Sequence, residues 1–343
     1  MTMRSTAACL VAAAAFLLMP LLQAADTLDV YVLDAEGGKA QIVKTPSGQA
    51  VLFDAGFPSA DDRDIKRIEA TAKLAGITAF DYFISTHYDV DHAGNIPALA
   101  ARIPIKVFID HGPMIVDPKM NPRNKAAAEA YLAFVADKKR VTVKPGDAIP
   151  LKDVKVTILT SNEQVLAKAL AGAGKPNAAC PTTPTVAAPA DDNSGSVGEL
   201  WEYGKFKMAD FGDLLRWVEN RLVCPTDKVG NIDLYISNHH GVTLSNSAEF
   251  LAALEPKVII MDNGDRKGNA VETQQIYRSG KRLQDIWQMH KSPAIPAELT
   301  PADNFLANLS ATDDQGYMIK VSARKDGSFT VTNGRNNFSK DYR

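Results

Sequence analysis

Two histidines and two aspartates lie close together near residue 90, in the run Thr86-His87-Tyr88-Asp89-Val90-Asp91-His92. All four are ligand types for a hard or borderline divalent metal ion. The apolar run Phe80–Ile84 before them predicts a strand, and the pattern of residues 93–100 after them predicts a turn and a short helix. A strand end and a tight turn can aim two pairs of side chains at neighbouring points. The spacing therefore predicts two metal ions side by side, with His87 and Asp89 on one and Asp91 and His92 on the other.

The elements that must carry these side chains alternate between strands and helices in both halves of the chain. Apolar alternation predicts strands at residues 27–33, 40–44, 50–53, 80–84, 105–109, 154–159, 195–201, 206–209, 234–237 and 258–261. Helical patterns cover residues 62–75, 248–254 and 283–290; the last includes His290, expected at the surface or in packing. Residues 171–193, rich in Ala, Pro and Thr, predict a long surface loop. Residues 317–323 and 328–333 predict a terminal hairpin around Asp326-Gly327.

Two strand-rich halves with interspersed helices fit two sheets packed face to face and flanked by helices. The motif at residue 87 resembles the His-x-His-x-Asp-His signature of the metallo-β-lactamase superfamily, with Asp89 in place of the second histidine. Together with Asp54-Ala55-Gly56, Gly212-Asp213 and His239-His240-Gly241, the order is similar to the secreted hydrolase domain of ComEC-type DNA-uptake proteins. This resemblance implies an α+β fold, the four-layer αβ/βα metallo-β-lactamase sandwich. Residues 26–343 are then expected to form one domain with a C-terminal hairpin extension.

The resemblance also implies further site residues. Asp213 is expected to bridge the two metal ions, with Asp210 as a nearby competitor, and Asp54 to orient ligands from beneath. His239 is expected to bind the second metal ion, and His240 to face substrate or hold a supporting hydrogen bond, so Asp91 and His240 are the catalytic candidates. The family's mid-chain histidine has no counterpart between Val154 and Asp213. His111 is the available substitute, and the alternative is a loop histidine that is not a ligand.

Two divalent ions that share a carboxylate would also hold a bridging water and lower its pKa, so that hydroxide forms near neutral pH. Zn²⁺ is the expected metal, and the hard ligand Asp89 keeps Mn²⁺ open. Asn263, Arg266 and Lys267 follow a predicted strand and are candidates for binding an anionic substrate. The leading hypothesis is a metal-dependent hydrolase of phosphodiesters. The alternatives are a lactone or amide hydrolase, including one for β-lactams, and a non-catalytic metal-binding protein of the same fold.

The N-terminus predicts export. Arg4, the apolar run Ala7–Leu22 and the small residues after it read as a signal peptide over residues 1–24, which implies a periplasmic or secreted protein without a membrane span after cleavage. An uncleaved anchor is the alternative. Cys180 and Cys224 then remain, and their pairing is left open because spacing alone does not bring them together. The net charge of −2 argues against a strong nucleic-acid footprint.

Overall fold

Two large mixed β-sheets form the centre of the molecule. The computed structural model describes residues 26–183, 191–310, 312 and 315–343. The first sheet has the strand order β18-β17-β16-β1-β2-β3-β4-β5-β6, and the second has the order β15-β14-β13-β12-β11-β10-β8-β7, with β9 beside β8. The strands are β1 (Leu28–Val32), β2 (Gln41–Lys44), β3 (Ala50–Phe53), β4 (Tyr82–Ile84), β5 (Phe108–Asp110), β6 (Arg140–Thr142), β7 (Ala148–Ile149), β8 (Lys155–Ser161), β9 (Gln164–Val165), β10 (Gly198–Tyr203), β11 (Phe206–Asp210), β12 (Leu234–Ile236), β13 (Val258–Met261), β14 (Asp285–His290), β15 (Leu306–Asn308), β16 (Ile319–Ala323), β17 (Phe329–Asn333) and β18 (Ser339–Tyr342).

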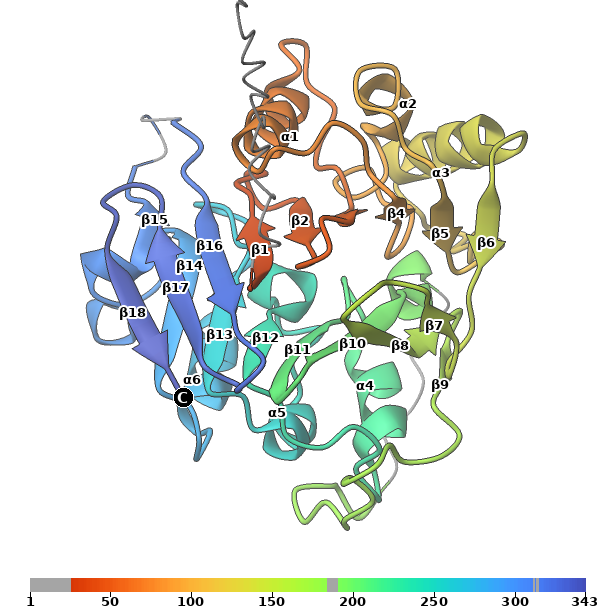
Figure 1. Ribbon diagram of the computed structural model, residues 1–343. Coiled ribbons are helices and arrows are strands. Elements are labelled where there is room, and N and C mark those ends of the chain that lie inside the picture. Colours follow the sequence, from red (N-terminus) through yellow and green to blue (C-terminus); the bar gives the residue numbers. More distant parts are fainter. Residues whose placement is uncertain (1–25, 184–190, 311, 313–314) are drawn as a thin grey trace, which may run out of the picture.

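The helices cover the outer faces of both sheets. Those near the first sheet are α1 (Arg63–Leu74), α2 (Ile96–Leu99) and α3 (Pro122–Val135), and those near the second are α4 (Arg216–Val223), α5 (Ala248–Leu254) and α6 (Val271–Arg278) (Figure 1). Three buried apolar clusters separate the layers. One contains side chains of both sheets, and each of the others joins a sheet to its own helices. The predicted four-layer αβ/βα sandwich is confirmed.

Within each sheet, a run of parallel strands points its carboxyl ends toward one rim. In the first sheet β3, β4, β5 and β6 are parallel, and in the second β11, β12, β13, β14 and β15 are parallel. Polar side chains that follow parallel strands therefore gather at the edge where the two sheets meet. The segments after β3, β4, β11, β12 and β13 carry the motifs that the sequence analysis singled out.

Residues 283–290 were expected to be helical, and this prediction is wrong. Asp285–His290 form β14, an inner strand paired with β13 on one side and β15 on the other. Five of its six residues are buried, so both of its faces lie in the core, and such a strand lacks the alternation that distinguishes strand from helix in sequence. His290 is accordingly buried. Its Nε2 lies 2.7 Å from Asp34 Oδ1.

The C-terminal hairpin is present and belongs to the main architecture. β16 and β17 pair antiparallel, as the predicted hairpin requires. β16 also pairs with β1 along its whole length. The segment 317–342 thus completes the first sheet instead of extending from it. The predicted signal peptide at residues 1–24 lies outside the described residues. Among those described, no helix combines the length and apolarity needed to cross a bilayer.

Cys180 and Cys224 are joined by a disulfide bond with a Cα–Cα distance of 5.7 Å. The bond ties the segment after β9 to the C-terminal end of α4, where Cys224 is the capping residue. The long segment 171–193, expected as one surface loop, is therefore anchored in its middle. Its last two residues, Asp192 and Asn193, are buried and begin a short 3₁₀ turn, Asp192–Gly195.

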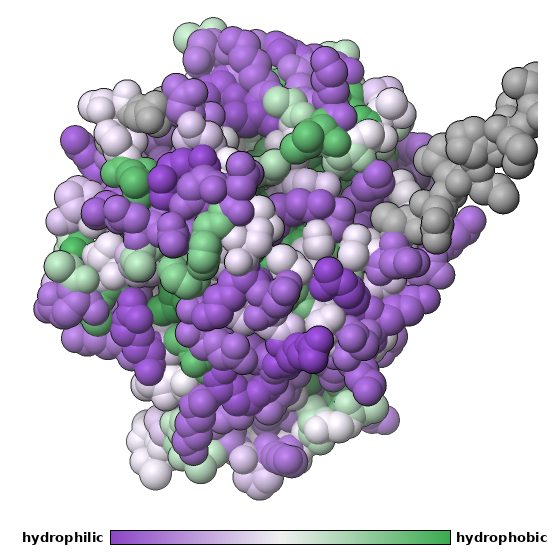
Figure 2. Space-filling view, turned by 60° about the vertical axis from the view of Figure 1, so that its left-hand side comes forward, coloured by the Kyte–Doolittle hydropathy of each residue, from purple (hydrophilic) through white to green (hydrophobic). Residues whose placement is uncertain are grey.

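The surface is polar over the face shown in Figure 2, where apolar atoms form small patches scattered among hydrophilic ones. The large apolar side chains that stand most exposed lie on separate elements; they are Leu74, Val116, Val141, Leu244 and Val271. Single exposed apolar residues are normal for soluble proteins and mark no binding surface.

Candidate metal centre

The turn after β4 is built on Asp54, which follows β3. Asp54 accepts hydrogen bonds from the backbone N–H and the hydroxyl of Thr86, at 2.9 and 2.7 Å. Its Oδ2 also lies 2.8 Å from Nδ1 of His92. Asp54 is fully buried and has a left-handed φ of 49°, a conformation that costs free energy and is typical of functional turns. The structure thus places Asp54 where the sequence expected it, beneath the motif and orienting a candidate ligand.

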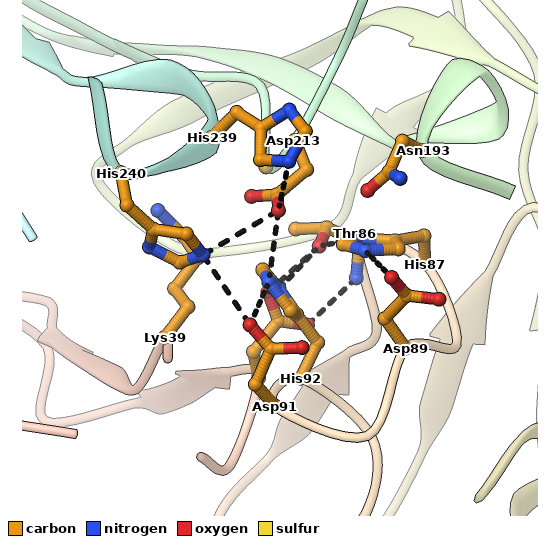
Figure 3. Close-up of polar contacts among 12 residues, drawn as sticks. Lys39, Thr86, His87, Asp89, Asp91, His92, Asn193, Asp213, His239 and His240 are labelled. Carbon is orange, nitrogen blue, oxygen red and sulfur yellow. Dashed lines mark hydrogen bonds and ion pairs between the residues drawn. The ribbon is translucent and has the colours of Figure 1, made fainter. Parts of the chain in front are cut away.

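Four side-chain atoms from three segments of the chain converge at one place (Figure 3). They are Asp91 Oδ2, His92 Nε2, Asp213 Oδ2 and His240 Nε2, and the four residues are buried. His92 Nε2 lies 3.5 Å from Asp91 Oδ2 and 3.4 Å from Asp213 Oδ2. His240 Nε2 lies 3.4 Å from each of the same two oxygens. Metal–ligand bonds of about 2.0–2.2 Å to tetrahedral corners place neighbouring ligand atoms about 3.3–3.6 Å apart.

The polar atoms of this cluster also fit a cation. Nε2 of His92 and Nε2 of His240 are buried and have no hydrogen-bond partner among the described residues. Burial by itself raises the pKa of Asp91 and of Asp213, yet the neighbouring histidines hold both well below the ordinary value. Burial and Lys267 lower the pKa of His240, whereas Asp213 and Asp262 raise it to about 10. Protons on imidazole therefore balance the carboxylates in the metal-free chain, and a divalent cation can replace them.

The two adjacent histidines lie differently from what the sequence analysis expected. His240 was expected to face substrate, but its side chain is fully buried and its Nε2 belongs to the four-atom cluster. His239 was expected to be the ligand, but its side chain is 13% exposed and it reaches the cluster only through Asp213, 3.4 Å away. Both residues have left-handed φ angles, 51° and 52°, which turn successive side chains differently from a strand. Sequence order alone did not reveal this pair of backbone conformations.

A second set of ligand types lies on the other side of Asp213. His87 Nε2 is 3.8 Å from Asp89 Oδ2, and Asn193 directs its carboxamide toward the same space (Figure 3). Three buried atoms there have no hydrogen-bond partner among the described residues: His87 Nε2, Asn193 Oδ1 and Asp213 Oδ1. Burial and Asp91 raise the pKa of Asp89 to about 8, and burial and His92 lower that of His87 to about 3. With these pKa values both side chains are neutral near pH 7 in the metal-free chain.

Asn193 is the residue that the sequence analysis missed. It comes from the 3₁₀ turn directly before β10, close to the position where a mid-chain ligand was sought and no histidine was found. The available signal was the polar run Asp191-Asp192-Asn193-Ser194 immediately before a predicted strand. That run lies at the end of residues 171–193, which were assigned to a surface loop because they are rich in Ala, Pro and Thr.

His111 does not join either set of ligand atoms in the structure. It follows β5, as predicted, and is buried, but its Nε2 lies 3.4 Å from Asp192 Oδ2 and its ring packs against Tyr88 at 4.3 Å. Asp192 in turn accepts hydrogen bonds from the backbone N–H groups of Tyr88 and Ile115. His111 therefore supports the turn that carries Asn193, so the alternative of a nearby histidine that is not a ligand fits better.

Asp210, the competitor for the bridging position, is directed away from the ligands. Its Oδ2 lies 3.0 Å from the ammonium of Lys39, and its Oδ1 accepts the backbone N–H of Gly212 at 3.0 Å. Gly212 has a φ of 55°, and a Cβ there would come within 2.5 Å of Thr86. The glycine lets the chain turn tightly after β11, so that Asp213 reaches the centre instead.

Of the three substrate-binding candidates after β13, only Lys267 lies at the centre. Its ammonium pairs with Asp91 Oδ2, and its side chain is 38% exposed. Arg266 was expected over the cleft, but its side chain is 88% exposed and its ion pair is with the adjacent Asp265. Asn263 is buried and donates to the carbonyl groups of Gly264 and His290, so it anchors the loop and does not face substrate. Successive side chains of this loop point in different directions, which residue type cannot predict.

The chain is similar in sequence to a family model and to a curated protein. The model of the metallo-β-lactamase superfamily matches residues 38–160, a stretch that contains the motif at residue 87. The curated protein ComE operon protein 3 of Bacillus subtilis (strain 168) is 28% identical over 196 residues. The match covers 57% of this chain and 21% of that protein, so it spans about a fifth of the relative's length.

Solved structures with similar chain folds have low sequence identity. The metallo-β-lactamase fold protein YhfI from Bacillus subtilis is 14% identical, with a TM-score of 0.43 over 76% of this chain and 96% of that chain. A diphosphatase from the PhnP family is 12% identical, with a TM-score of 0.38 over 77% and 95% of the two chains. Neither likeness bears on the activity of this chain. The chain is thus similar to the metallo-β-lactamase superfamily over residues 38–160 and to ComE operon protein 3, and the family match supports the predicted class of enzyme, a metal-dependent hydrolase.

Proposed function

We propose that this chain is an exported hydrolase that uses two divalent metal ions and acts on anionic esters, with phosphodiesters as the leading substrate class. The observation that carries the proposal is a set of four ligand atoms within 4.8 Å of one another, in which the four histidine–carboxylate separations, 3.4–3.5 Å, match the edge length of a metal tetrahedron. Asp91, His92, Asp213 and His240 would hold one ion. His87, Asp89 and Asn193 would hold the other, with Asp213 shared between them.

When bound, two such ions supply a Lewis acid for the substrate oxygen and lower the pKa of a water molecule. The protein contributes orientation and proton handling. Asp54 fixes the imidazole of His92 through Nδ1, so that Nε2 faces the ligand cluster. His239 is partly exposed at the opening, where its Nε2 can deliver a proton to a leaving group while Ser245 Oγ, 3.3 Å from Nδ1, holds the ring.

The preference for an anionic substrate rests on Lys267. Its ammonium lies at the centre, is partly exposed, and is held over the ring of Phe57 at 5.3 Å. Burial alone lowers the pKa of Lys267, but Asp91 and Asp213 raise it above the ordinary value, so the side chain stays cationic. An ammonium beside the ligands can bind a phosphate or carboxylate oxygen as a point charge. Hydrolysis of a neutral lactone would leave this charge without a partner on the substrate.

Export is supported by the disulfide bond between Cys180 and Cys224, because such bonds persist in oxidising compartments. The signal-like segment at residues 1–24 points the same way. The periplasm or the extracellular space is therefore the proposed location.

The experiment is an activity screen on purified protein that begins at residue 26. Metal-stripped protein is reloaded with Zn²⁺ or Mn²⁺ and assayed on bis-p-nitrophenyl phosphate, nitrocefin and a simple lactone. We expect metal-dependent turnover of the phosphodiester, lost in His92→Gln and retained in the matched control His290→Gln, a buried histidine outside the centre. Preferred turnover of nitrocefin or the lactone would favour the alternative substrates. Metal binding without any turnover would favour a non-catalytic protein.

A further inference from the structure

A buried lysine lies beneath the candidate metal centre, in a part of the structure that the proposed chemistry does not use. Lys39 follows the Gly37-Gly38 turn between β1 and β2, and its side chain is 2% exposed. Taking an ammonium out of water costs several kcal/mol unless other charges compensate it. Burial alone lowers the pKa of Lys39, but Asp210 and Asp262 raise it above the ordinary value, so the buried group keeps its charge.

The ammonium of Lys39 connects the ends of two strands in the second sheet. Its Nζ lies 3.0 Å from Asp210 Oδ2, after β11, and 3.1 Å from Asp262 Oδ2, after β13. The other oxygen of Asp210 holds the backbone N–H of Gly212, next to the bridging candidate Asp213. The other oxygen of Asp262 lies 3.6 Å from Nδ1 of His240. Each carboxylate therefore contacts Lys39 on one side and a ligand-bearing segment on the other.

The backbone of Lys39 adds contacts within the first sheet. Its N–H donates to the carbonyl of Asp91 at 3.0 Å, and its own carbonyl accepts from Gly56 at 2.8 Å. The approach is close: a Cβ on Gly38 would come within 2.9 Å of the same Asp91 carbonyl oxygen. One residue thus touches, directly or through one partner, the segments that carry Asp91, Asp213 and His240.

We propose that Lys39 is the positioning residue of the metal centre, acting mainly through Asp262 to hold His240 with Nε2 directed at the ion. The inference rests on the proposed metal centre. A ligating imidazole needs a partner on its other nitrogen to fix its tautomer and orientation. Asp262 Oδ1 lies 3.6 Å from that nitrogen, as an ion pair just beyond hydrogen-bond distance, and neither atom has another hydrogen-bond partner among the described residues. Lys39 keeps Asp262 in place, because its ammonium holds Oδ2 of that carboxylate at 3.1 Å.

Glu199 does not share this task. It is fully buried on the neighbouring strand β10, and neither of its carboxylate oxygens has a hydrogen-bond partner among the described residues. Burial and Asp210 raise the pKa of Glu199 well above the ordinary value, so it does not compete for the ammonium as an anion. The charge of Lys39 is thus directed to Asp210 and Asp262.

The test is a double-mutant cycle on metal affinity. Lys39→Met, Asp262→Asn and the double variant are purified metal-free, and their affinity for Zn²⁺ is measured by competition with a chromophoric chelator. Each single change should weaken Zn²⁺ binding tenfold to a hundredfold, the usual effect of removing support from a ligand. The Zn²⁺ affinity of the double variant should be only slightly lower than that of the single variant with the lower affinity, because both changes break the same connection. Lys257→Met, which removes a lysine paired with Asp233 far from the centre, is the matched control and should keep the wild-type affinity.

A second variant distinguishes a purely structural role of Lys39 from a role in positioning the metal ligands. Lys39→Met leaves Asp210 as an uncompensated buried anion, so Lys39→Met/Asp210→Asn should recover thermal stability yet keep the weakened Zn²⁺ affinity. If Lys39→Met does not fold, the cycle is run in the Asp210→Asn background. Wild-type Zn²⁺ affinity in Lys39→Met, or additive effects in the cycle, would overturn the role proposed for Lys39 and leave the proposed metal centre untouched. Failure of the wild-type chain to bind Zn²⁺ would instead refute the metal centre itself, and the role of Lys39 with it.

Discussion

The disulfide bond between Cys180 and Cys224 should account for a large share of the stability of the folded chain. The bond closes a loop with a sequence separation of 44 residues. In the chain-entropy model, opening a loop of this length returns about 13 cal/mol/K to the unfolded chain, which corresponds to about 4 kcal/mol at 25 °C. The folded state loses less, because Asn177 still donates to the carbonyl groups of Val223 and Glu249, at 3.4 and 2.8 Å. The cost therefore falls mainly on the unfolded side of the equilibrium.

The perturbation is the double variant Cys180→Ser/Cys224→Ser, compared with oxidised wild type in thermal unfolding by calorimetry. For about 320 residues, an unfolding entropy of about 2.1 cal/mol/K per residue converts 4 kcal/mol into a decrease of about 6 °C in Tm. Wild type in excess reductant should behave like the double variant, which controls for the serine substitutions. Equal Tm values for oxidised wild type and the double variant would refute the reasoning. Two titratable thiols in denatured, unreduced wild type would show that the bond does not form.

Three further changes test separate parts of the site and core. Asp54→Asn keeps an acceptor for Thr86 but loses the one facing His92, so Zn²⁺ affinity should decrease by about tenfold to a hundredfold in chelator competition. Lys267→Ala should raise KM for bis-p-nitrophenyl phosphate about tenfold or more, whereas Arg266→Ala, whose side chain is 88% exposed, should leave kinetics unchanged; the reverse order would restore Arg266 as the substrate residue. His290→Gln should cost about 1.5–3 kcal/mol in urea unfolding near pH 5–6. Burial lowers the pKa of His290, but its hydrogen bond to Asp34 raises it above 6.5, so this contribution is complete below pH 6.5 and is lost as the pH rises through the folded-state value. A cost independent of pH would contradict the ion pair.

The fold was predictable because its signals are local. The alternating strands of the first half, the turn glycines and the polar residues after apolar strands all follow from residue type and spacing. The strand β14 was not predictable in this way, since Asp285–His290 is buried on both faces and its pattern also suits a helix. The correct assignment depends on pairing with β13 and β15, which is a contact between distant parts of the chain.

The sequence predicted which residues form the candidate site better than it predicted how each side chain is placed there. Asp91, His92 and Asp213 converge as the motifs indicated, because each follows a parallel strand that ends at the shared rim. The placement of the His239 and His240 side chains depends on two left-handed backbone conformations, which the sequence does not encode in a recognisable pattern. Which side chain of a loop faces a cleft is decided by tertiary packing.

The positions of Lys39 and Asn193 at the site could not be predicted from the sequence for a related reason. A lysine in a turn and an asparagine in a polar run are usually exposed, and their burial results from the packing of the two sheets. Composition gives no sign that a single ammonium lies between Asp210 and Asp262. Such residues can be recognised only once the strand ends are brought together in three dimensions.

Anomalous diffraction from Zn²⁺-loaded crystals, recorded on both sides of the zinc absorption edge, tests the central claim most directly. We predict a zinc peak bonded at about 2.0–2.2 Å to Asp91, His92, Asp213 and His240. A second peak is expected between Asp213 and His87. Crystals of His240→Ala should lose the first peak, and crystals of His239→Ala should keep it. Zinc bound to His239 in place of His240, or no zinc peak among these four residues, would contradict the proposed metal centre.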